Sequence, residues 1–446
     1  MRDAWRQALH LEPPQGWLND PNGLCWLDGT WHVFFQYCPD SASGSGRKCW
    51  GHWESPDLLA WTFRGAALEP DTPWDRSGVY SGCALVTDGG VRFYYTGNVK
   101  HPGSYDYITA GREANVLLVQ SPDGERMGEK QLLLTNAGYP ADCSCHVRDP
   151  KVWRDPDGFH MVLGARSLQS RGRVLLYKSP DGERWEHEAT IEKPEPFGYM
   201  WECPDYFELS GRGILSVSPQ GLPHEAERFQ NVYQSGWFSV EGPLKEGKLG
   251  GFTEWDHGFD FYAPQSFLAP DGRRLLLGWM GLPDAPYGCA TLAFGRQHCL
   301  TLLREVFWDG EGRLCQRPAR ELRRLCGLPS IRQEKAALPF RLTGEPKGPF
   351  ALTLGGGLSL RWDGALFTLE FTDNVLGCGR TVRRARLPRC RAIEVIADRS
   401  SAEVFLDGGA AVLSTRFFPA EPEISLRAEG FDPIVQPMQP MDFTGL

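Results

Sequence analysis

Three short acidic strings, far apart in the sequence, carry the residues that could do chemistry. In each string a proline follows the carboxylate within two residues. Proline lacks an amide hydrogen and restricts the residue before it to extended backbone conformations. Each string therefore predicts a carboxylate held rigidly near a strand end. The strings are Trp17-Leu18-Asn19-Asp20-Pro21-Asn22-Gly23, Arg148-Asp149-Pro150 and Trp201-Glu202-Cys203-Pro204.

Three carboxylates that meet in one pocket could cleave a glycosidic bond. Cleavage through an oxocarbenium-like transition state needs one ionised carboxylate and one protonated acid, and a third can oppose the developing positive charge. We expect Asp20, beside amide donors, to stay ionised as the nucleophile. We expect burial of Glu202 against Trp201 to favour the protonated form that an acid/base needs. In that case the carboxyl groups of Asp20 and Glu202 should lie roughly 5 to 5.5 Å apart, as in retaining enzymes.

A single string of this kind does not establish a site. Asp-Pro-Asn-Gly on its own is typical of an Asx-Pro turn ahead of a hairpin. Acids scattered over a solvated surface, however, would not recur beside prolines in three separate units. The chemistry therefore depends on elements that bring the three strings together.

The elements that must position these strings are repeated β units. A turn signal followed by an alternating or aromatic strand recurs at positions 28, 88, 157, 210 and 271, with spacings of 60, 69, 53 and 61 residues. Five copies of one unit, each too short to bury its own faces, indicate radial repetition. We therefore predict an all-β protein with a five-bladed β-propeller over residues 1–316. A pair of β-sandwiches with coincidental spacing is the alternative.

The pattern changes after residue 316. Residues 318–325 form the most helical string of the chain, closed by Gly327 and Pro329, and predict a linker helix within 317–329. Short alternating strands then predict a β-sandwich over residues 330–446. We expect no chemistry there, but structural support or a homo-oligomer contact between copies of the chain.

Composition limits the class of protein. The 446 residues suffice for two or more cores, and 23% charged with 41% hydrophobic residues describe an ordinary globular protein. A net charge of −9 gives no electrostatic reason to bind nucleic acid or an anionic membrane. Thirteen cysteines without framework spacing favour a reducing compartment, and the charged start lacks a signal peptide's apolar core. We expect a cytoplasmic protein with neither nucleic-acid nor membrane partner.

Two further signals concern ligands other than sugar. Cys143-Ser144-Cys145-His146 resembles half a metal site, but no second Cys/His pair has zinc-like spacing, so we expect no metal and no cofactor. A phosphate group would need basic residues near the pocket mouth, such as Arg47, Lys48 or Arg112. The alternative is that each of these is a solvated loop charge, because no phosphate-loop motif is present.

The three acidic strings resemble, in the right order, the signature blocks of glycoside hydrolase family 32, the β-fructofuranosidases. The resemblance extends over nearly the whole chain and implies a five-bladed propeller followed by a β-sandwich, with no metal. Further blocks similar to the family are Phe34-Phe35-Gln36, Cys49-Trp50-Gly51-His52, Tyr80-Ser81-Gly82, Asp260-Phe261-Tyr262-Ala263-Pro264-Gln265, Gly278-Trp279-Met280 and Glu403-Val404-Phe405-Leu406-Asp407-Gly408.

Carried over position by position, the resemblance implies a role for each acid. Asp20 would be the nucleophile, Glu202 the acid/base, and Asp149 the transition-state stabiliser. Trp17 and Trp50 would wall the pocket or serve packing only. The predicted substrate-binding set is Trp17, Leu18, Asn19, Gln36, Tyr80, Ser81 and Arg148.

Within the family, the strings at 198–205 and 215–221 look most like the bacterial sucrose-6-phosphate hydrolases. The resemblance implies a small sugar substrate, either sucrose 6-phosphate or sucrose or both. A fructosyltransferase would use the same residues, and an inverting arabinan-type propeller enzyme would separate its carboxyl groups further. A non-catalytic sugar-binding propeller is the alternative outside enzymes, although a pure binder would not need all three acids.

Overall fold

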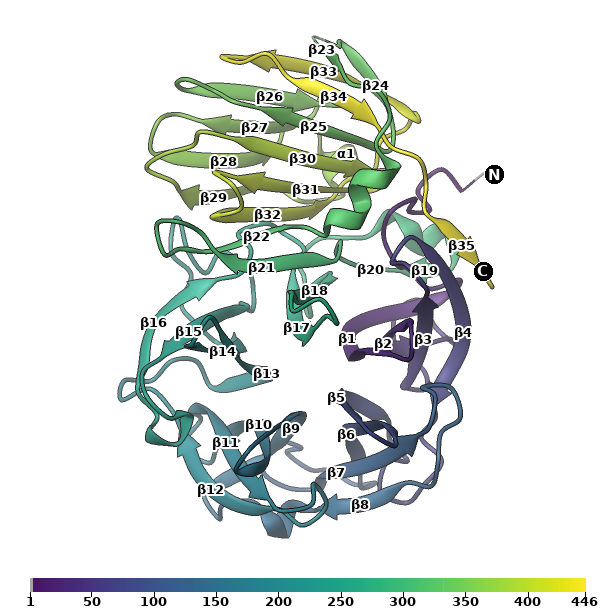
Figure 1. The fold of residues 1–446 in the computed structure, drawn as a ribbon, viewed down its shortest axis with the longest axis vertical. Coiled ribbons are helices and arrows are strands. Elements are labelled where there is room, and N and C mark those ends of the chain that lie inside the picture. The colour runs from purple at the N-terminus through teal and green to yellow at the C-terminus, as the bar shows by residue number, and fades with distance from the viewer. Residues whose placement is uncertain (1–2, 332) are drawn as a thin grey trace.

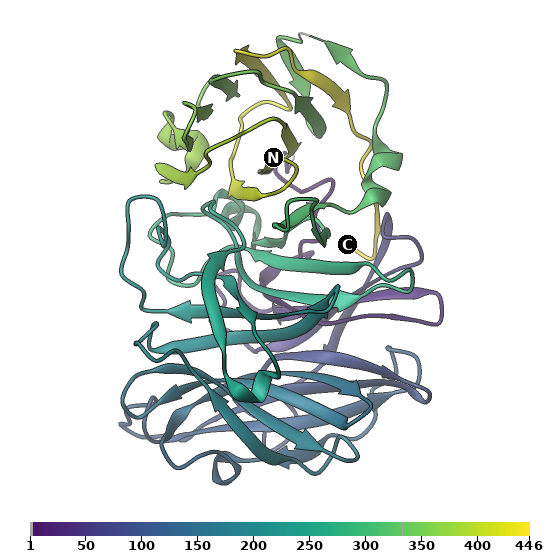
Figure 2. The same cartoon turned by 60° about the vertical axis from the view of Figure 1, so that its left-hand side comes forward.

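Nearly all regular structure is β in the computed structural model, which describes residues 3–331 and 333–446. Five sheets follow one another along the N-terminal part of the chain and surround a common centre; we call them the ring (Figure 1). Two further sheets stack face to face beyond one side of the ring and form a C-terminal β-sandwich (Figures 1 and 2).

Each sheet of the ring begins with a strand at the centre and continues outward in antiparallel order (Figure 1). The strands of the five sheets are β1 (Gly16–Leu27), β2 (Thr30–Cys38), β3 (Cys49–Ser55) and β4 (Ala60–Leu68); β5 (Val79–Thr87), β6 (Gly90–Lys100), β7 (Arg112–Ser121) and β8 (Gln131–Leu134); β9 (Cys143–Asp155), β10 (Gly158–Ser167), β11 (Gly172–Ser179) and β12 (Glu186–Ile191); β13 (Met200–Leu209), β14 (Arg212–Gln220), β15 (Gly236–Val240) and β16 (Leu249–Glu254); and β17 (Tyr262–Leu268), β18 (Arg274–Met280), β21 (Arg304–Trp308) and β22 (Leu314–Pro318). The short strands β19 (Arg296–Gln297) and β20 (Cys299–Leu300) pair with β1 and β18.

The turn signals in the sequence explain the hairpins. Between β1 and β2, Asp28 and Gly29 have φ of 47° and 90°, and Leu27 pairs with Thr30. A two-residue turn with positive φ at both positions matches the twist of the strands, and Asp-Gly favours it. The inner strands therefore return on themselves at short range, so the unit is built locally and repeated.

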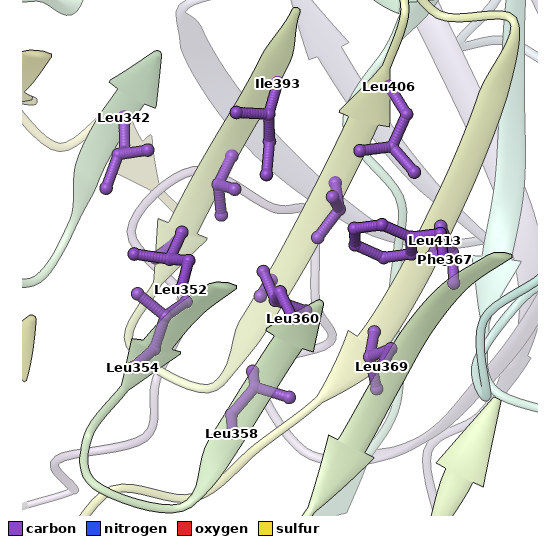
Figure 3. Close-up of a cluster of buried hydrophobic side chains, with 14 of the residues drawn as sticks. Leu342, Leu352, Leu354, Leu358, Leu360, Phe367, Leu369, Ile393, Leu406 and Leu413 are labelled. Carbon is purple, nitrogen blue, oxygen red and sulfur yellow. The ribbon is translucent and has the colours of Figure 1, made fainter. Parts of the chain in front are cut away.

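The C-terminal sandwich consists of two six-stranded sheets in the described residues. Alternating apolar residues from both sheets, such as Leu342, Leu360 and Leu413, interdigitate with no exposed area and form its core (Figure 3). One sheet contains β23 (Ser330–Ile331), β34 (Ile434–Pro437), β25 (Phe340–Gly344), β30 (Ile393–Asp398), β31 (Ser401–Leu406) and β32 (Ala411–Arg416); the other contains β24 (Lys335–Ala337), β33 (Glu423–Glu429), β26 (Phe350–Leu354), β27 (Leu358–Trp362), β28 (Leu366–Phe371) and β29 (Val382–Arg386).

Helices are few and short in the described residues. Four are 3-10 helices: η1 (Asn136–Gly138), η2 (Leu244–Glu246), η3 (Ala290–Phe294) and η4 (Arg320–Leu325); the fifth is α1 (Asn374–Gly377). Residues 317–329, expected to be a linker helix, hold the end of β22 and then η4. No helix among residues 3–331 and 333–446 is long and apolar enough to cross a bilayer.

The chain crosses the expected boundaries between the two regions at both ends. β35 (Asp442–Thr444) leaves the sandwich and pairs in parallel with β4, the outer strand of the first sheet. An unpaired edge strand exposes backbone hydrogen-bonding groups, and β35 satisfies those of β4. Conversely, the first described residues lie against the sandwich, where the backbone amides of Ala8 and Leu9 donate to Asp398. Both termini therefore fasten the ring to the sandwich (Figure 1).

Candidate active site

All five inner strands carry the same irregularity at the same level of the ring. In each, two residues lie opposite a single residue of the next strand, which is a β-bulge. A bulge interrupts the alternation of side chains and re-aims them. The bulged pairs are Asn19-Asp20 in β1, Tyr80-Ser81 in β5, Asp149-Pro150 in β9, Cys203-Pro204 in β13 and Ala263-Pro264 in β17.

Three of the bulges place a non-glycine residue in the left-handed region. Asp149, Cys203 and Ala263 have φ of 63°, 47° and 48°, and each precedes a proline. Such conformations cost energy and persist only where the surrounding structure fixes them, most often at functional sites. The prolines recognised in the sequence thus accompany a strained bulge, not only an extended strand end.

The bulges give a common frame for comparing the sheets. Glu202 lies directly before its bulge, as Arg148 does in β9 and Tyr262 in β17, whereas Asp149 is the first residue of its bulge and Asp20 the second residue of its own. Cys203 is the first bulge residue of β13, equivalent to Asp149, and its Sγ lies 3.6 Å from the Oδ2 atoms of both Asp20 and Asp149. The three acids therefore meet from three successive positions along their inner strands.

Asp20 is a partly buried carboxylate with a small set of donors. Ser81 Oγ donates to Oδ2 at 2.5 Å and Asn19 Nδ2 to Oδ1 at 3.1 Å. Burial raises the pKa of Asp20, and the hydrogen bonds from Ser81 and Asn19 only partly oppose it. The expected amide donor is present and acts in the expected direction, but burial outweighs the hydrogen bonds in the net direction of the pKa shift.

Asp149 has a strongly perturbed carboxyl group. Its Oδ2 accepts the backbone amide of Cys203 at 2.9 Å, and its own amide donates to Thr96 Oγ1. Burial raises the pKa of Asp149 to about 7, against the opposing charge of Arg148. A carboxyl group whose pKa is shifted to near neutrality among other acids is typical of a functional site.

Glu202 is held by polar partners on both oxygens. Arg148 Nη2 and Nε donate to Oε1 at 2.5 and 3.1 Å, and Oε2 accepts Gln220 Nε2 at 2.8 Å and the Tyr262 hydroxyl at 2.7 Å. The expectation that Glu202 would be buried against Trp201 is wrong. Trp201 packs on Phe238, and its indole nitrogen donates to the Phe197 carbonyl. Adjacent strand residues point to opposite faces, which separates the two side chains.

Some of the other residues predicted to contact the sugar lie beside the carboxylates, and others lie in the core. Trp17 is half-buried and donates from its ring nitrogen to Asn19 Oδ1 at 2.9 Å, which orients that amide toward Asp20. Leu18 has no exposed area and lies in the core of the first and fifth sheets. Gln36 is 4% exposed and donates to the Val79 carbonyl next to the bulge of β5.

Two aromatic residues near the bulge of β5 differ in their solvent exposure. Trp50 has no exposed area and donates to the Tyr80 carbonyl, so its role is packing. The Tyr80 ring is half-buried, with the Arg112 guanidinium 5.6 Å above its centroid. Of these two rings, Tyr80 is the one accessible to a ligand.

Sequence reasoning missed three members of the site: Tyr262, Gln220 and Cys203. Tyr262 and Gln220 touch the same oxygen of Glu202, and Cys203 touches both aspartates. A signal for Tyr262 was available, because it lies two residues before a proline, as Glu202 and Arg148 do. Burial raises the pKa of the Cys203 thiol well above its usual range, so it serves as a weak donor and not as a nucleophile.

A possible metal-binding group lies away from these acids. In the described residues, one group has metal-ligand proximity: His32, His52 and Glu54, on β2 and β3. His32 Nδ1 and His52 Nε2 share a hydrogen bond of 3.0 Å, and Glu54 pairs with Arg64. Burial lowers the pKa of His52 to about 3 and keeps it neutral. Hydrogen bonding within the blade accounts for this group.

Comparison with known proteins agrees with the geometry. The model of the glycosyl hydrolases family 32 N-terminal domain matches residues 10–318, and the model of the family's C-terminal part matches residues 380–439. Sucrose-6-phosphate hydrolase of Klebsiella pneumoniae is 40% identical over 439 residues, which are 95% of this chain and 90% of that protein. Raffinose invertase of Escherichia coli is 38% identical, over 94% and 90% of the two chains.

A solved structure of similar fold contains a sugar. A β-fructofuranosidase mutant of Bombyx mori in complex with sucrose superposes with a TM-score of 0.85 and 28% identity, covering 99% of this chain and 96% of that one. The likeness extends over both the ring and the sandwich.

Proposed function

The chain belongs to glycosyl hydrolase family 32, and from this premise we propose that it is a retaining β-fructofuranosidase. The observation that carries the proposal is the meeting of Asp20, Asp149 and Glu202 at the bulges of three inner strands. The three acids come from successive positions of their inner strands, so a fructosyl ring can lie between a nucleophile and an acid.

In the first half of the reaction, protonated Glu202 gives its proton to the glycosidic oxygen as that bond breaks. Asp20 attacks the anomeric carbon from the opposite side and forms a covalent fructosyl-enzyme. Ser81 and Asn19 hold the two oxygens of Asp20 and so fix the attacking one. Arg148, Gln220 and Tyr262 fix Glu202 in the same way.

In the second half, Glu202 removes a proton from water, the water attacks the anomeric carbon, and the bond to Asp20 breaks. Both transition states place positive charge on the fructosyl ring. Asp149, 5% exposed and touching neither leaving group nor water in this scheme, opposes that charge when ionised. Fructose leaves with the configuration of the substrate, because two inversions occur.

For the substrate, we propose sucrose 6-phosphate, sucrose or both. The support is the printed function of the relatives: a sucrose-6-phosphate hydrolase at 40% identity and a raffinose invertase at 38%. The phosphorylated sugar favours the cytoplasm, which also suits thirteen cysteines that form no disulfide within residues 3–331 and 333–446.

We also propose that the ring is a five-bladed β-propeller, with a catalytic domain over 1–316, a linker over 317–329 and a sandwich over 330–446. Five successive sheets with their first strands at the centre support this description. The crossing of residues 3–12 and of β35 means that neither domain is expected to fold fully without the other.

Glucose release from sucrose, measured with the purified protein, tests the activity. Proton NMR of the first turnovers tests the stereochemistry, with β-fructofuranose appearing before mutarotation. First appearance of the α-anomer would require an inverting mechanism. Absence of hydrolysis with sucrose and with sucrose 6-phosphate would leave a sugar-binding protein. Oligosaccharides at high sucrose concentration would identify a fructosyltransferase.

A further inference from the structure

A group of basic residues lies beside the carboxylates and has no part in the chemistry above. Arg112 begins β7, His146 lies in β9 and Arg166 lies in β10, so two neighbouring sheets contribute. Arg112 Nη1 donates to His146 Nε2 at 3.2 Å, and its Nε donates to Asn98 Oδ1 at 2.7 Å. Arg166 neighbours His146 across the strand pair, because Ala165 pairs with Val147.

The positive charge of this group is not neutralised by acids. In the part of the chain that the structure describes, neither Arg112 nor Arg166 forms an ion pair with a carboxylate. Arg166 Nη2 donates to Ser170, while its buried Nε has no partner. The acids nearby are paired elsewhere: Glu113 with His101, Asp142 with Arg173, and Glu202 with Arg148. Two arginines left unpaired in a protein of net charge −9 indicate an anionic ligand.

The electrostatics of His146 agree with this geometry. Burial, followed by the charges of Arg148, Arg112 and Arg166, lowers the pKa of His146 to about 2. The ring is therefore neutral and accepts a hydrogen bond from Arg112, which orients the guanidinium. His146 acts as a positioning residue, and the two arginines carry the charge.

The group lies beside Glu202, on the side where the proposed mechanism places the leaving sugar. His146 and Arg148 are two residues apart on one strand and share a face, and Arg148 contacts Glu202, the proposed proton donor to the leaving oxygen. Arg112 stacks on Tyr80, next to Ser81, which holds Asp20. Arg166 stacks on Tyr199, which leads into the strand of Glu202. These contacts place the arginines around the outer side of Glu202.

Resting on the proposed function, we propose that Arg112 and Arg166 bind the phosphate group of the leaving sugar and so set the preference for sucrose 6-phosphate over sucrose. Guanidinium groups bind phosphate oxygens with charge-assisted, often bidentate, hydrogen bonds. Two other bases suggested by the sequence are occupied. Arg47 pairs with Asp40 and Glu69, and the Lys48 ammonium donates to the Gly44 carbonyl above Trp17.

The alternative is a purely structural role, in which both arginines only stack on tyrosines and stabilise loops. Substrate discrimination separates the two interpretations. We expect Arg112→Gln and Arg166→Gln each to lower the ratio of kcat/KM on sucrose 6-phosphate to kcat/KM on sucrose by on the order of 10- to 100-fold. A merely structural loss lowers both values together and leaves the ratio unchanged.

Arg154→Gln is the matched control. Arg154 lies near the other end of β9, the strand that carries His146, is exposed, and stacks on Phe159 at 5.2 Å, so it copies the cation–π contact away from the carboxylates. We expect the ratio to stay at the wild-type value in this variant. Arg112→Lys keeps the charge without the planar fork and should fall between wild type and Arg112→Gln.

Inhibition by leaving sugars gives a readout in the unmodified protein. Glucose 6-phosphate should inhibit sucrose hydrolysis at least tenfold more strongly than glucose, and the difference should shrink in Arg166→Gln. This measurement decides the matter even where Arg112→Gln fails to fold. Equal inhibition by the two sugars, or an unchanged ratio in both variants, overturns the phosphate site while the fructosidase stands. A wild-type protein that hydrolyses neither substrate overturns the proposed function instead.

Discussion

The carboxylates at the centre of the ring and those at the junction with the sandwich are both gathered from distant parts of the chain, and both are buried. They differ in their partners. At the junction Arg304 contacts Glu403 and Asp256, and His10 bridges Asp398 and Glu403 at 2.8 and 3.0 Å, all without exposed area. At the centre, Arg148 pairs with Glu202 and Asp149, and Asp20 forms no ion pair within the described residues.

The direction of each carboxyl pKa shift depends on the charged and hydrogen-bonding partners of that group. Burial acts to raise the pKa of Asp398 and Glu403, but His10 and Arg304 outweigh it and lower both. At the centre, burial prevails and raises the pKa of Asp20 and Asp149. Asp256 is the exception at the junction, since burial raises its pKa to about 6 in spite of Arg304. Carboxyl groups whose partners outweigh the effect of burial stabilise the fold. Carboxyl groups with too few partners remain available to interact with a substrate.

Exchanging one acid in each group for its amide should separate activity from stability most strongly. Asp20→Asn should lower kcat by about 10⁴-fold or more, because the nucleophile is lost. Its melting temperature should stay at or above that of wild type, since burial disfavours the Asp20 charge. Asp398→Asn should do the reverse, keeping kcat at low temperature and lowering the melting temperature. Near-wild-type turnover of Asp20→Asn would reject it as nucleophile.

Removing the cation at the junction should be the most damaging change to stability. Arg304→Met leaves Glu403 and Asp256 buried without their charged partner and should cost about 3–5 kcal/mol of unfolding free energy. Chemical denaturation measures this. Arg317→Met, which removes a partly exposed pair with Glu305, is the control and should cost at most about 1 kcal/mol. A similar loss in both variants would contradict the contrast between buried and exposed pairs.

Alkaline pH should weaken the junction alone. Burial acts against it, but hydrogen bonds to Asp398 and Glu403 raise the pKa of His10 from 6.5 to about 9. The stabilisation from protonated His10 is therefore complete below pH 6.5 and lost as pH rises through about 9, on the order of 2–3 kcal/mol. The melting temperature should fall across this window in wild type and fall less in His10→Gln. Parallel curves for the two proteins would contradict the assignment.

Acid pH should first lower the activity that depends on the carboxylates at the centre of the ring. With a pKa of about 7, Asp149 becomes protonated as pH falls below neutrality and then cannot oppose the charge of the transition state. Below pH 7, kcat/KM should therefore fall by about tenfold per pH unit. The fold is affected with the opposite sign, because a raised carboxyl pKa makes the protonated form the more stable one. A kcat/KM that stays flat down to pH 5 would exclude ionised Asp149 from the reaction.

The smallest effect is expected at Cys203. Its thiol lies 3.6 Å from both aspartates and stays protonated, so it contributes one weak hydrogen bond. Cys203→Ala should lower kcat by less than about tenfold, and Cys203→Ser should restore it. Iodoacetamide should leave the native enzyme active. A loss as large as that of Asp20→Asn would make the thiol a participant in the chemistry.

Much of the site was predictable because its residues stand in local strings. Asp20, Asp149 and Glu202 precede prolines that accompany the bulges, and the family resemblance gave their roles. Tyr262 escaped because a tyrosine before Ala-Pro has no chemical meaning until its hydroxyl is seen on Glu202. Leu18 lies between Trp17 and Asn19 in the sequence, but strand alternation turns its side chain into the core.

The sequence by itself determined the hairpin turns, the repeated β unit and the three carboxylates, because these depend on backbone preferences over a few residues. Only the tertiary structure decided which side chains share the centre, since ring closure joins strands more than a hundred residues apart. It alone decided the ionisation of those acids as well. Desolvation depends on everything that surrounds a carboxyl group, and the same residue type therefore stabilises the junction and remains available for chemistry in the ring.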